Sequence, residues 1–311
     1  MGEDINTAAA LYPHLDPTVA QVACRANADR LKFLQEDRFI PYGAADLVLK
    51  ELNKILTWPN SVRPPSRLLV AQSDMGKSTI FGQFFAQHPA LDNVDGPAAH
   101  IPVLKMQFPE SGSDGVYGEI IRKLNAETTA NPSSRALRSQ ALHLLDAVGN
   151  RVLVIDEIAN VIVKDVKRQT IAMNAIKFIT NEMERPIVLG VTPEAFSLVI
   201  GDKNLKSRFQ PLFLPRFKDV FDKHGRSDYR EFLYGFELAL PLRKPSKLAE
   251  NNILAHEIMV RSFGITGAIS RLLVESAVVA IETGEEQITP DVIKAVVWND
   301  SDTVKSKLED L

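Results

Sequence analysis

The chain has 311 residues, of which 45% are hydrophobic and 24% are charged, and its formal net charge is -3. This composition is typical of a soluble globular protein and excludes a polycation, so contact with nucleic acid requires a local basic face or one assembled by several subunits. The single cysteine, Cys24, excludes an intramolecular disulfide framework and cysteine-rich zinc motifs. Because no apolar run is long enough to span a bilayer and no signal peptide is visible, we expect a cytoplasmic protein with no membrane partner.

The predicted elements follow an N-terminal extension, residues 1–44, which carries one or two helices. In chain order we then predict a helix at 45–57, followed by SRLLVAQSDMGKSTIFGQFF, which begins as a strand and ends as a helix. Next come a strand at 101–108, helices at 115–126 and 133–149, and a strand at 152–156. The pattern ends with a helix at 171–184, a strand at 186–192, a helix at about 193–200 and a strand around 212–214. Ser133 or Ser134 is the expected N-cap of the fourth of these helices.

Strands that alternate with helices predict an α/β fold with a parallel, doubly wound sheet. We place this core at residues 45–240. The composition changes near 241–245, and beyond that point only helical patterns remain, at 247–263, 268–283 and 289–298. The sequence therefore predicts a small all-helical domain at residues 241–300, followed by a tail at 301–311.

The turn between the first strand and its helix resembles a phosphate-binding loop. Its segment AQSDMGKS matches the Walker A pattern GxxxxGK(S/T) except at the first position, Ala71. In such loops backbone N–H groups and a helix N-terminus surround the phosphates, a lysine contacts the β- and γ-phosphates, and a hydroxyl binds magnesium. We therefore expect ATP and Mg²⁺ as cofactors, bound by Ser73, Asp74, Met75, Gly76, Lys77 and Ser78.

The segment VLVIDE at residues 152–157 has the pattern of a Walker B strand. Asp156 would support the magnesium together with Ser78, and Glu157 would orient and polarise the attacking water. An ordinary buried strand that ends in two acids is the alternative. The phosphate loop lies about 80 residues upstream, and its presence favours the Walker B interpretation.

Two later residues extend the predicted catalytic site. Thr192 ends a predicted strand, where many P-loop ATPases carry a polar sensor for the γ-phosphate, although it is also the expected N-cap of the next helix. Arg208 precedes the last strand, where an arginine could contact the nucleotide of a neighbouring subunit and stabilise transition-state charge. A plain surface arginine is the alternative for Arg208.

These segments together resemble the TniB/TnsC group of AAA+ ATPases, which regulate target choice in DNA transposition. The similar segments are RLKFLQEDRFIPYGAADLVLKEL, LLVAQSDMGKSTI, RVLVIDEIANVI, NAIKFITNEMERPIVLGVTPEAF, RFQPLFLPRF and FELALPLRKPSKL. PLRKPS is the most distinctive of them, because generic P-loop chemistry does not require it. Family members usually have glycine at the position of Ala71.

The resemblance implies an AAA+ core with a helical lid, and it implies ATP-dependent rings or helical filaments on double-stranded DNA. It further implies recruitment of a transposase, contact with a target-selection protein, and disassembly by ATP hydrolysis. In the lid, Arg271 is similar in place to a second sensor arginine, one position from the usual spacing, with a structural role as the alternative and Arg261 as a weaker candidate. Candidate DNA contacts, or else solvated helix faces, are Arg122, Lys123, Lys164, Lys167 and Arg168.

Two other functions stay open from the sequence. One is a nucleotide-dependent scaffold with little hydrolysis, which Ala71 favours and the pair Asp156 and Glu157 disfavours. The other is a clamp-loader or chaperone-like ATPase with no role in transposition, which the junction at residues 240–248 and the lead-in segment RLKFLQEDRFIPYGAADLVLKEL disfavour.

Overall fold

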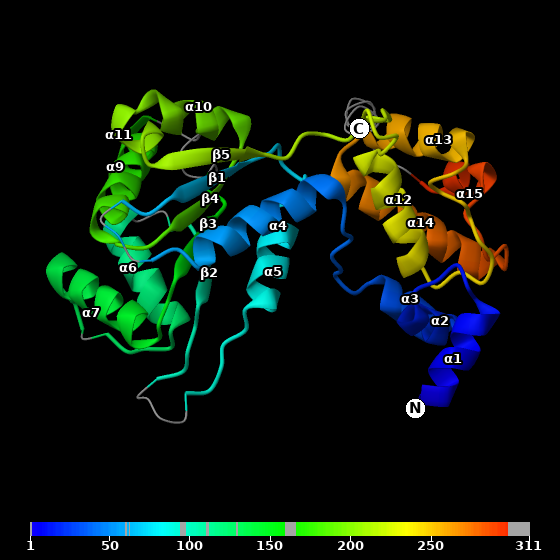
Figure 1. Cartoon of the computed structure of the whole chain (residues 1–311), viewed down its shortest axis with the longest axis horizontal. Helices are drawn as coiled ribbons and strands as arrows, with labels where there is room; N and C mark the ends of the chain where they lie inside the picture. The colour runs from blue at the N-terminus through cyan, green and yellow to red at the C-terminus, as the bar shows by residue number, and fades with distance from the viewer. Residues whose placement is uncertain are drawn as a thin grey trace, which may run out of the picture. The chain divides into compact units, whose positions relative to one another are not determined.

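The computed structural model describes residues 2–59, 61, 63–93, 98–109, 112–128, 130–158 and 166–297. The chain divides into two compact units, one formed by Leu47–Pro215 and the other by Met1–Asp46 together with Arg216–Leu311. We call them the sheet unit and the chain-end unit. Figure 1 shows the strands of the first and the helices of the second.

The sheet unit contains a five-stranded sheet with the strand order β2-β3-β4-β1-β5. Every neighbouring pair is parallel, so all five carboxyl ends lie at one edge. The strands are β1 (Ser66–Val70), β2 (Val103–Gln107), β3 (Val152–Asp156), β4 (Ile187–Val191) and β5 (Phe209–Phe213). The predicted parallel, doubly wound sheet is therefore confirmed.

The three central strands, β3, β4 and β1, are buried along their whole length. Short runs of Val, Ile and Leu form such strands because both faces of a parallel sheet are covered by helices. The helices of this unit are α5 (Lys77–Gln87), α6 (Gly112–Lys123), α7 (Ser134–Ala147), α9 (Val166–Glu182), α10 (Pro193–Gly201) and α11 (Lys203–Lys206), while α4 (Gly43–Leu56) begins in the chain-end unit. One core cluster packs the strands against α6, α7, α9 and α10. As predicted, Ser133 caps α7, since its hydroxyl accepts a hydrogen bond from Ala136 N–H at 3.2 Å.

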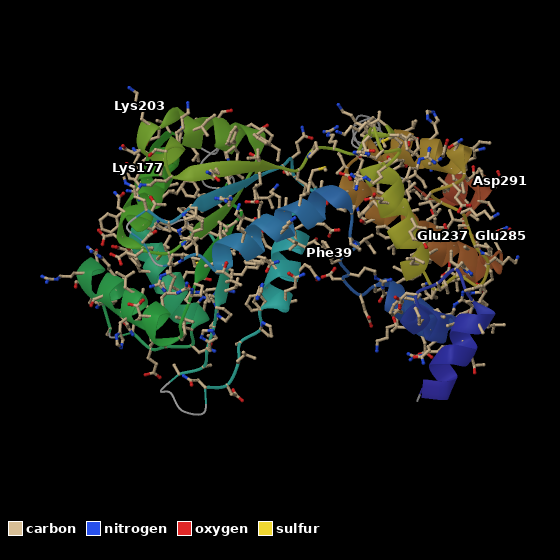
Figure 2. The ribbon with its side chains drawn as sticks, viewed as in Figure 1. Phe39, Lys177, Lys203, Glu237, Glu285 and Asp291 are labelled. Carbon is tan, nitrogen blue, oxygen red and sulfur yellow. The ribbon has the colours of Figure 1, made fainter. Side chains whose placement is uncertain are left out.

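The chain-end unit is helical in its described residues. It contains α1 (Gly2–Leu11), α2 (Pro17–Ala23), α3 (Asn27–Leu34), α12 (Asp228–Ala239), α13 (Asn252–Ser262), α14 (Thr266–Thr283) and α15 (Pro290–Ala295). The sequence analysis did not identify α12, which buries Tyr229 and Phe236. The Tyr229 hydroxyl donates to the Ala255 carbonyl in α13 at 2.6 Å, and the Glu237 carboxylate accepts from Lys247 and Leu248 N–H at 2.6 and 2.7 Å. Glu237 is labelled in Figure 2.

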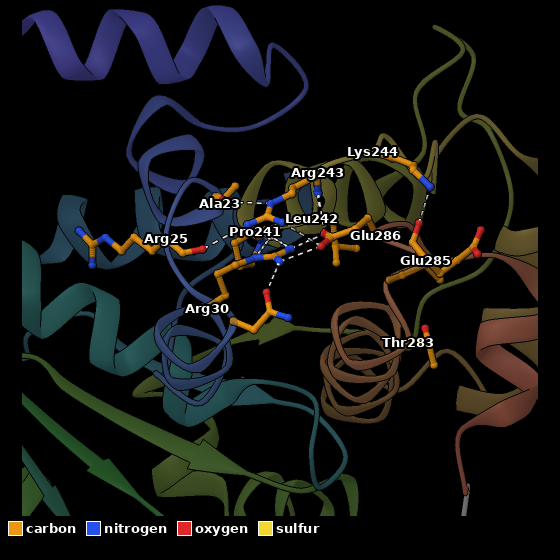
Figure 3. A network of polar contacts seen from close by, with 12 residues as sticks. Ala23, Arg25, Arg30, Pro241, Leu242, Arg243, Lys244, Thr283, Glu285 and Glu286 are labelled. Atoms are coloured by element: carbon orange, nitrogen blue, oxygen red, sulfur yellow. Dashed lines mark hydrogen bonds and ion pairs between the residues drawn. The ribbon is translucent and has the colours of Figure 1, made fainter.

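A buried arginine joins the first helices to the last ones in this unit. Arg30 is fully buried, and its Nε and Nη2 donate to the Pro241 carbonyl at 3.0 and 2.8 Å (Figure 3). Its Nη1 donates to Glu286 Oε1 at 2.9 Å, and Nη2 forms a second, shorter contact with Oε2. Arg243 reinforces the junction, because its Nε donates to the Ala23 carbonyl at 3.1 Å. PLRKPS thus supplies a carbonyl and a guanidinium that hold the N-terminal helices in place.

The predicted domain limits differ from these units. The predicted core, 45–240, extends past Pro215 into α12, which packs with α13, and the predicted extension, 1–44, groups with the C-terminal helices through Arg30. Division into extension, core and lid stays a prediction, and the tail 301–311 lies outside the described residues. Among the helices that the structure describes, none has both the length and the apolar composition that crossing a membrane requires.

Candidate functional site

The phosphate loop joins β1 to α5 at the carboxyl edge of the sheet. Gly76 occupies the N-cap of α5 with φ 81°, a left-handed conformation that favours glycine, and Asp74 also has a positive φ of 63°. Met75 is buried between them, while Ser73 and Asp74 are exposed. The predicted strand–turn–helix is therefore formed, and the exposed loop leads directly into the N-terminus of α5, a geometry suited to anion binding.

Lys77 is the cation of this loop. Its Nζ donates to the carbonyls of Ala71 and Gln72 at 2.8 and 2.9 Å. Burial lowers the pKa of Lys77, although the nearby charges of Asp156 and Glu194 act in the opposite direction. The ammonium therefore lies in a partly desolvated position among carboxylates, where a phosphate would replace loop carbonyls as its partner.

Ala71, the departure from the Walker A pattern, fits this loop without strain. Its side chain is buried, and its N–H donates to the Val191 carbonyl at 3.1 Å, which extends the pairing of β1 with β4 by one residue. The residue is not among those with a positive φ, so the backbone at this position does not require glycine. The substitution therefore leaves the loop conformation intact.

The predicted magnesium ligands meet across the site. Ser78 Oγ donates to Asp156 Oδ2 at 2.6 Å, and Asp156 is buried at the end of β3. Two oxygens that converge from a hydroxyl and a carboxylate are the donors that Mg²⁺ prefers. The pair therefore fits the metal that the phosphate loop implies. Among the described residues, no group of three or more His, Cys, Asp and Glu side chains could hold a metal without a nucleotide.

Glu157 follows Asp156 in a strained conformation. Its φ is 59°, which is uncommon for a residue with a side chain, and its N–H donates to Asp156 Oδ1 at 2.9 Å. The side chain is exposed at the carboxyl edge of the sheet. Strain of this kind persists where the surrounding structure fixes it, and the exposed Glu157 carboxylate is accessible to a water molecule.

Gly190 in β4 is a site residue that the sequence analysis missed. A Cβ at this position would lie 2.4 Å from Asp156 Oδ1 and 2.9 Å from Phe81 Cε2. Only a glycine lets β4 pass so close to the Walker B carboxylate. An isolated glycine inside the buried strand IVLGV was the signal in the sequence.

Thr192 serves as the N-cap of α10, since its hydroxyl accepts from Ala195 N–H at 3.4 Å. The alternative that the sequence left open, an N-cap role for Thr192, is thus observed, and the sensor role stays a prediction.

Glu194, which was not predicted as a site residue, follows two positions after Thr192. Hydrogen bonds from its own N–H and from Thr192, with the charge of Lys77, lower the pKa of Glu194. The carboxylate therefore stays ionised near the phosphate loop.

Arg208 lies at the opposite edge of the sheet. The register of β1 with β5 pairs Ser66 with Phe209 and Val70 with Phe213, so Arg208 is beside the start of β1 while the phosphate loop follows its end. Five residues of strand separate the two edges by about 16 Å. Arg208 therefore cannot act on the nucleotide of its own loop, and its Nη1 donates to the Thr180 carbonyl at 2.7 Å.

The candidate DNA residues come from two helices of the sheet unit. Arg122 and Lys123 lie in the last turn of α6, whereas Lys167 lies in the first turn of α9. Arg122 is also paired with Glu119 at 2.7 Å. Lys164 lies outside the described residues, and the side chain of Arg168 is not described.

The two lid candidates lie in the chain-end unit. Arg271 is exposed on α14. Arg261 donates to Glu257 Oε1 at 2.9 Å and to the Ile293 carbonyl at 2.8 Å, which is a structural role. A sensor role for Arg271 stays a prediction.

Three solved structures resemble the chain. Cdc6p from Pyrobaculum aerophilum has 14% identity and a TM-score of 0.55, over 88% of this chain and 73% of that one. The Walker-type ATPase paby2304 of Pyrococcus abyssi has 15% identity and a TM-score of 0.54, over 89% and 79%. The Orc1 protein of Aeropyrum pernix, solved in complex with DNA, has 14% identity and a TM-score of 0.51, over 90% and 69%. This similarity confirms the fold of an AAA+ P-loop ATPase.

The sequence itself identifies the family. None of the curated proteins matches the chain. The family described as "Bacterial TniB protein" matches residues 30–219, which is more than half of the chain and includes both the phosphate loop and the Walker B strand. PLRKPS lies beyond the matched residues. By this match, and as the resemblance of these motifs predicted, the chain belongs to the TniB family.

Proposed function

We propose that this chain is an ATP-dependent regulator of DNA transposition that assembles on double-stranded DNA and links a target-selection protein to a transposase. The observation that carries the proposal is the convergence of Lys77, Ser78, Asp156 and Glu157 at one sheet edge in a member of the TniB family. The family gives the biological context, and the site gives the chemistry.

In the proposed reaction, ATP is hydrolysed to ADP and phosphate. Lys77 neutralises charge on the β- and γ-phosphates, and Glu157 orients the attacking water. Magnesium, held by Ser78 and supported by Asp156, would neutralise further phosphate charge. The intact Ser78–Asp156 contact and the unstrained Ala71 support hydrolysis over a scaffold that only binds nucleotide.

Arg208 acts between subunits in this proposal. Its place at the edge opposite the phosphate loop supports a contact with the nucleotide of a neighbouring copy. Such an arginine stabilises the charge of the transition state, so hydrolysis would depend on assembly. We further propose that Thr192, next to Glu194 and Lys77, contacts the γ-phosphate.

DNA binding would come from repetition of small basic faces. With a net charge of -3, one subunit neutralises few phosphates, whereas an assembly adds many weak contacts. Orc1 of Aeropyrum pernix, which shares the fold, was solved in complex with DNA, and this supports the proposal. Lys123 and Lys167 are exposed candidates. Because they come from two different helices, we propose that each makes its own contact with the DNA backbone.

The test is a salt titration of DNA binding with ATP present. Lys123→Glu and Lys167→Glu should each weaken binding to all sequences alike, and each should lower the salt slope by about 0.9 per lost phosphate contact. Lys50→Glu, an equal charge change at an exposed position of α4, is the control. Unchanged salt slopes in both variants would show that residues other than Lys123 and Lys167 contact the DNA. ATP-dependent assembly without DNA would favour the clamp-loader or chaperone-like alternative, and ATP binding without turnover would favour the scaffold.

A further inference from the structure

A polar cavity lies in the sheet unit, at the edge opposite the phosphate loop. It has a volume of about 240 Å³ and is lined by the ends of α9 and α11 and by the segment before β1. Its polar lining residues include Arg63, Lys177, Thr180, Asn181, Asn204 and Arg208. Figure 2 shows Lys177 and Lys203 on this part of the unit, and of the two only Lys177 lines the cavity.

The charge of this cavity is positive. Lys177 is paired with Asp202 at 2.7 Å, so one of the three lining cations is neutralised and two remain, those of Arg63 and Arg208. Arg63 is exposed, and no described residue forms an ion pair with it. Two guanidinium groups beside the amides of Asn181 and Asn204 offer many N–H donors, the chemistry that recognises a phosphate group.

Arg208 is held in place by a main-chain carbonyl. The Arg208 Nη1 donates to the carbonyl of Thr180 at 2.7 Å, and the Thr180 hydroxyl donates in turn to the Ile176 carbonyl at 2.7 Å. This contact uses one N–H group and leaves the rest of the guanidinium for a ligand. The cavity therefore has a fixed cation on one side and an exposed cation on the other.

The phosphate loop of the same subunit cannot reach this cavity. The phosphate loop and the cavity lie at opposite sheet edges, about 16 Å apart along β1 and β5, so one subunit cannot join them. A contact between two different faces of identical subunits is heterologous, and it generates a ring or a helical filament. The cavity is thus placed to receive ATP bound by the next subunit.

We propose that Arg63 is a second cation acting between subunits, which contacts the terminal phosphates of ATP held by a neighbouring copy beside Arg208. Asn181 and Asn204 complete the donor set. This proposal rests on the proposed function and adds to it a binding residue in the segment before β1, outside the Walker motifs. Loss of one hydrogen bond to a charged group corresponds to about a 10- to 100-fold effect.

The experiment compares Arg63→Ala with Lys203→Ala, which removes the same charge nearby from an exposed position outside the cavity. Arg63→Ala should lower ATP turnover in the assembled state about 10- to 100-fold, and Arg63→Lys should restore part of it. Lys203→Ala should match the wild type. Nucleotide binding to dilute subunits should be equal in all of them.

A mixture of variants separates a contact between subunits from a role within one. Arg63→Ala keeps its phosphate loop, and Glu157→Gln keeps its cavity but lacks the residue that orients water. Turnover that rises above the sum of the separate activities when the two impaired variants are mixed supports the proposal. No rise on mixing, or turnover of Arg63→Ala equal to that of Lys203→Ala, overturns it while leaving the proposed function intact. A wild-type chain that neither assembles with ATP nor hydrolyses it overturns both.

Discussion

Replacement of Gly190 by alanine perturbs the Walker B carboxylate directly. The added Cβ would lie 2.4 Å from Asp156 Oδ1, whereas ordinary contact begins at 3.4 Å, so the carboxylate must move by 3.4 − 2.4 = 1.0 Å. Asp156 Oδ2 accepts from Ser78 at 2.6 Å, and Oδ1 accepts from Glu157 N–H at 2.9 Å. A carboxylate is rigid, so one displacement disturbs the proposed magnesium ligand and the proposed catalytic base together.

The expected magnitudes follow from that displacement. Overpacking of a buried site costs about 1–3 kcal/mol, which a folded domain of this size tolerates. Misplacement of catalytic groups by about 1 Å costs about 100-fold in rate. We therefore expect Gly190→Ala to fold, to bind ATP through Lys77, and to turn over ATP about 100-fold more slowly at saturating nucleotide and magnesium.

The assay is steady-state ATP turnover with a parallel thermal unfolding curve. Gly118→Ala in α6 is the matched control, since no heavy atom lies within 4 Å of a Cβ at that position. Alanine inside a helix should stabilise this control by up to about 1 kcal/mol and leave turnover unchanged. Wild-type turnover in Gly190→Ala would refute the idea that close passage of β4 fixes Asp156.

The remaining predictions concern three other residues. Lys77→Ala should lose detectable ATP binding, because the phosphate charge loses its partner; titration with a fluorescent ATP analogue checks this, and wild-type affinity would contradict it. Glu157→Gln should bind ATP, hydrolyse little and form longer-lived assemblies, measured by phosphate release and light scattering; turnover at the wild-type rate would remove Glu157 from the mechanism. Glu286→Gln should destabilise the chain-end unit by about 3 kcal/mol, because fully buried Arg30 would lose its charged partner. Although burial acts to raise it, hydrogen bonds from Arg30 hold the pKa of Glu286 below its ordinary 4.5. The stability that Glu286 contributes is therefore complete above pH 4.5 and lost as the pH falls through the lower folded value. Urea denaturation between pH 3 and 7 should show a weaker acid dependence in the variant, and identical dependence would refute the assignment.

The sheet and the nucleotide site were predictable because their signals are local. The apolar composition of segments such as VLVID predicts buried strands, and a few consecutive residues around Gly76 and Lys77 determine the phosphate loop. The contact of Ser78 with Asp156 spans 78 residues of sequence, but the two motifs that supply it are each recognisable alone. Local sequence patterns were therefore enough to predict the fold class and the core of the nucleotide site.

Other features depend on contacts between distant segments. The grouping of the N-terminal helices with the C-terminal ones rests on Arg30 and Glu286, which are 256 residues apart, and no periodicity reveals that pair. Gly190 left a visible signal, but its meaning required the distance to Asp156.

The central claim is that ATP drives assembly of this chain on double-stranded DNA. Electron microscopy of the wild-type chain with DNA and a slowly hydrolysed ATP analogue tests it most directly, with Lys77→Ala as the control. We predict rings or helical filaments on DNA with the analogue, and none without nucleotide or in Lys77→Ala. Assemblies that form equally well without nucleotide, or single subunits under all of these conditions, would contradict the claim.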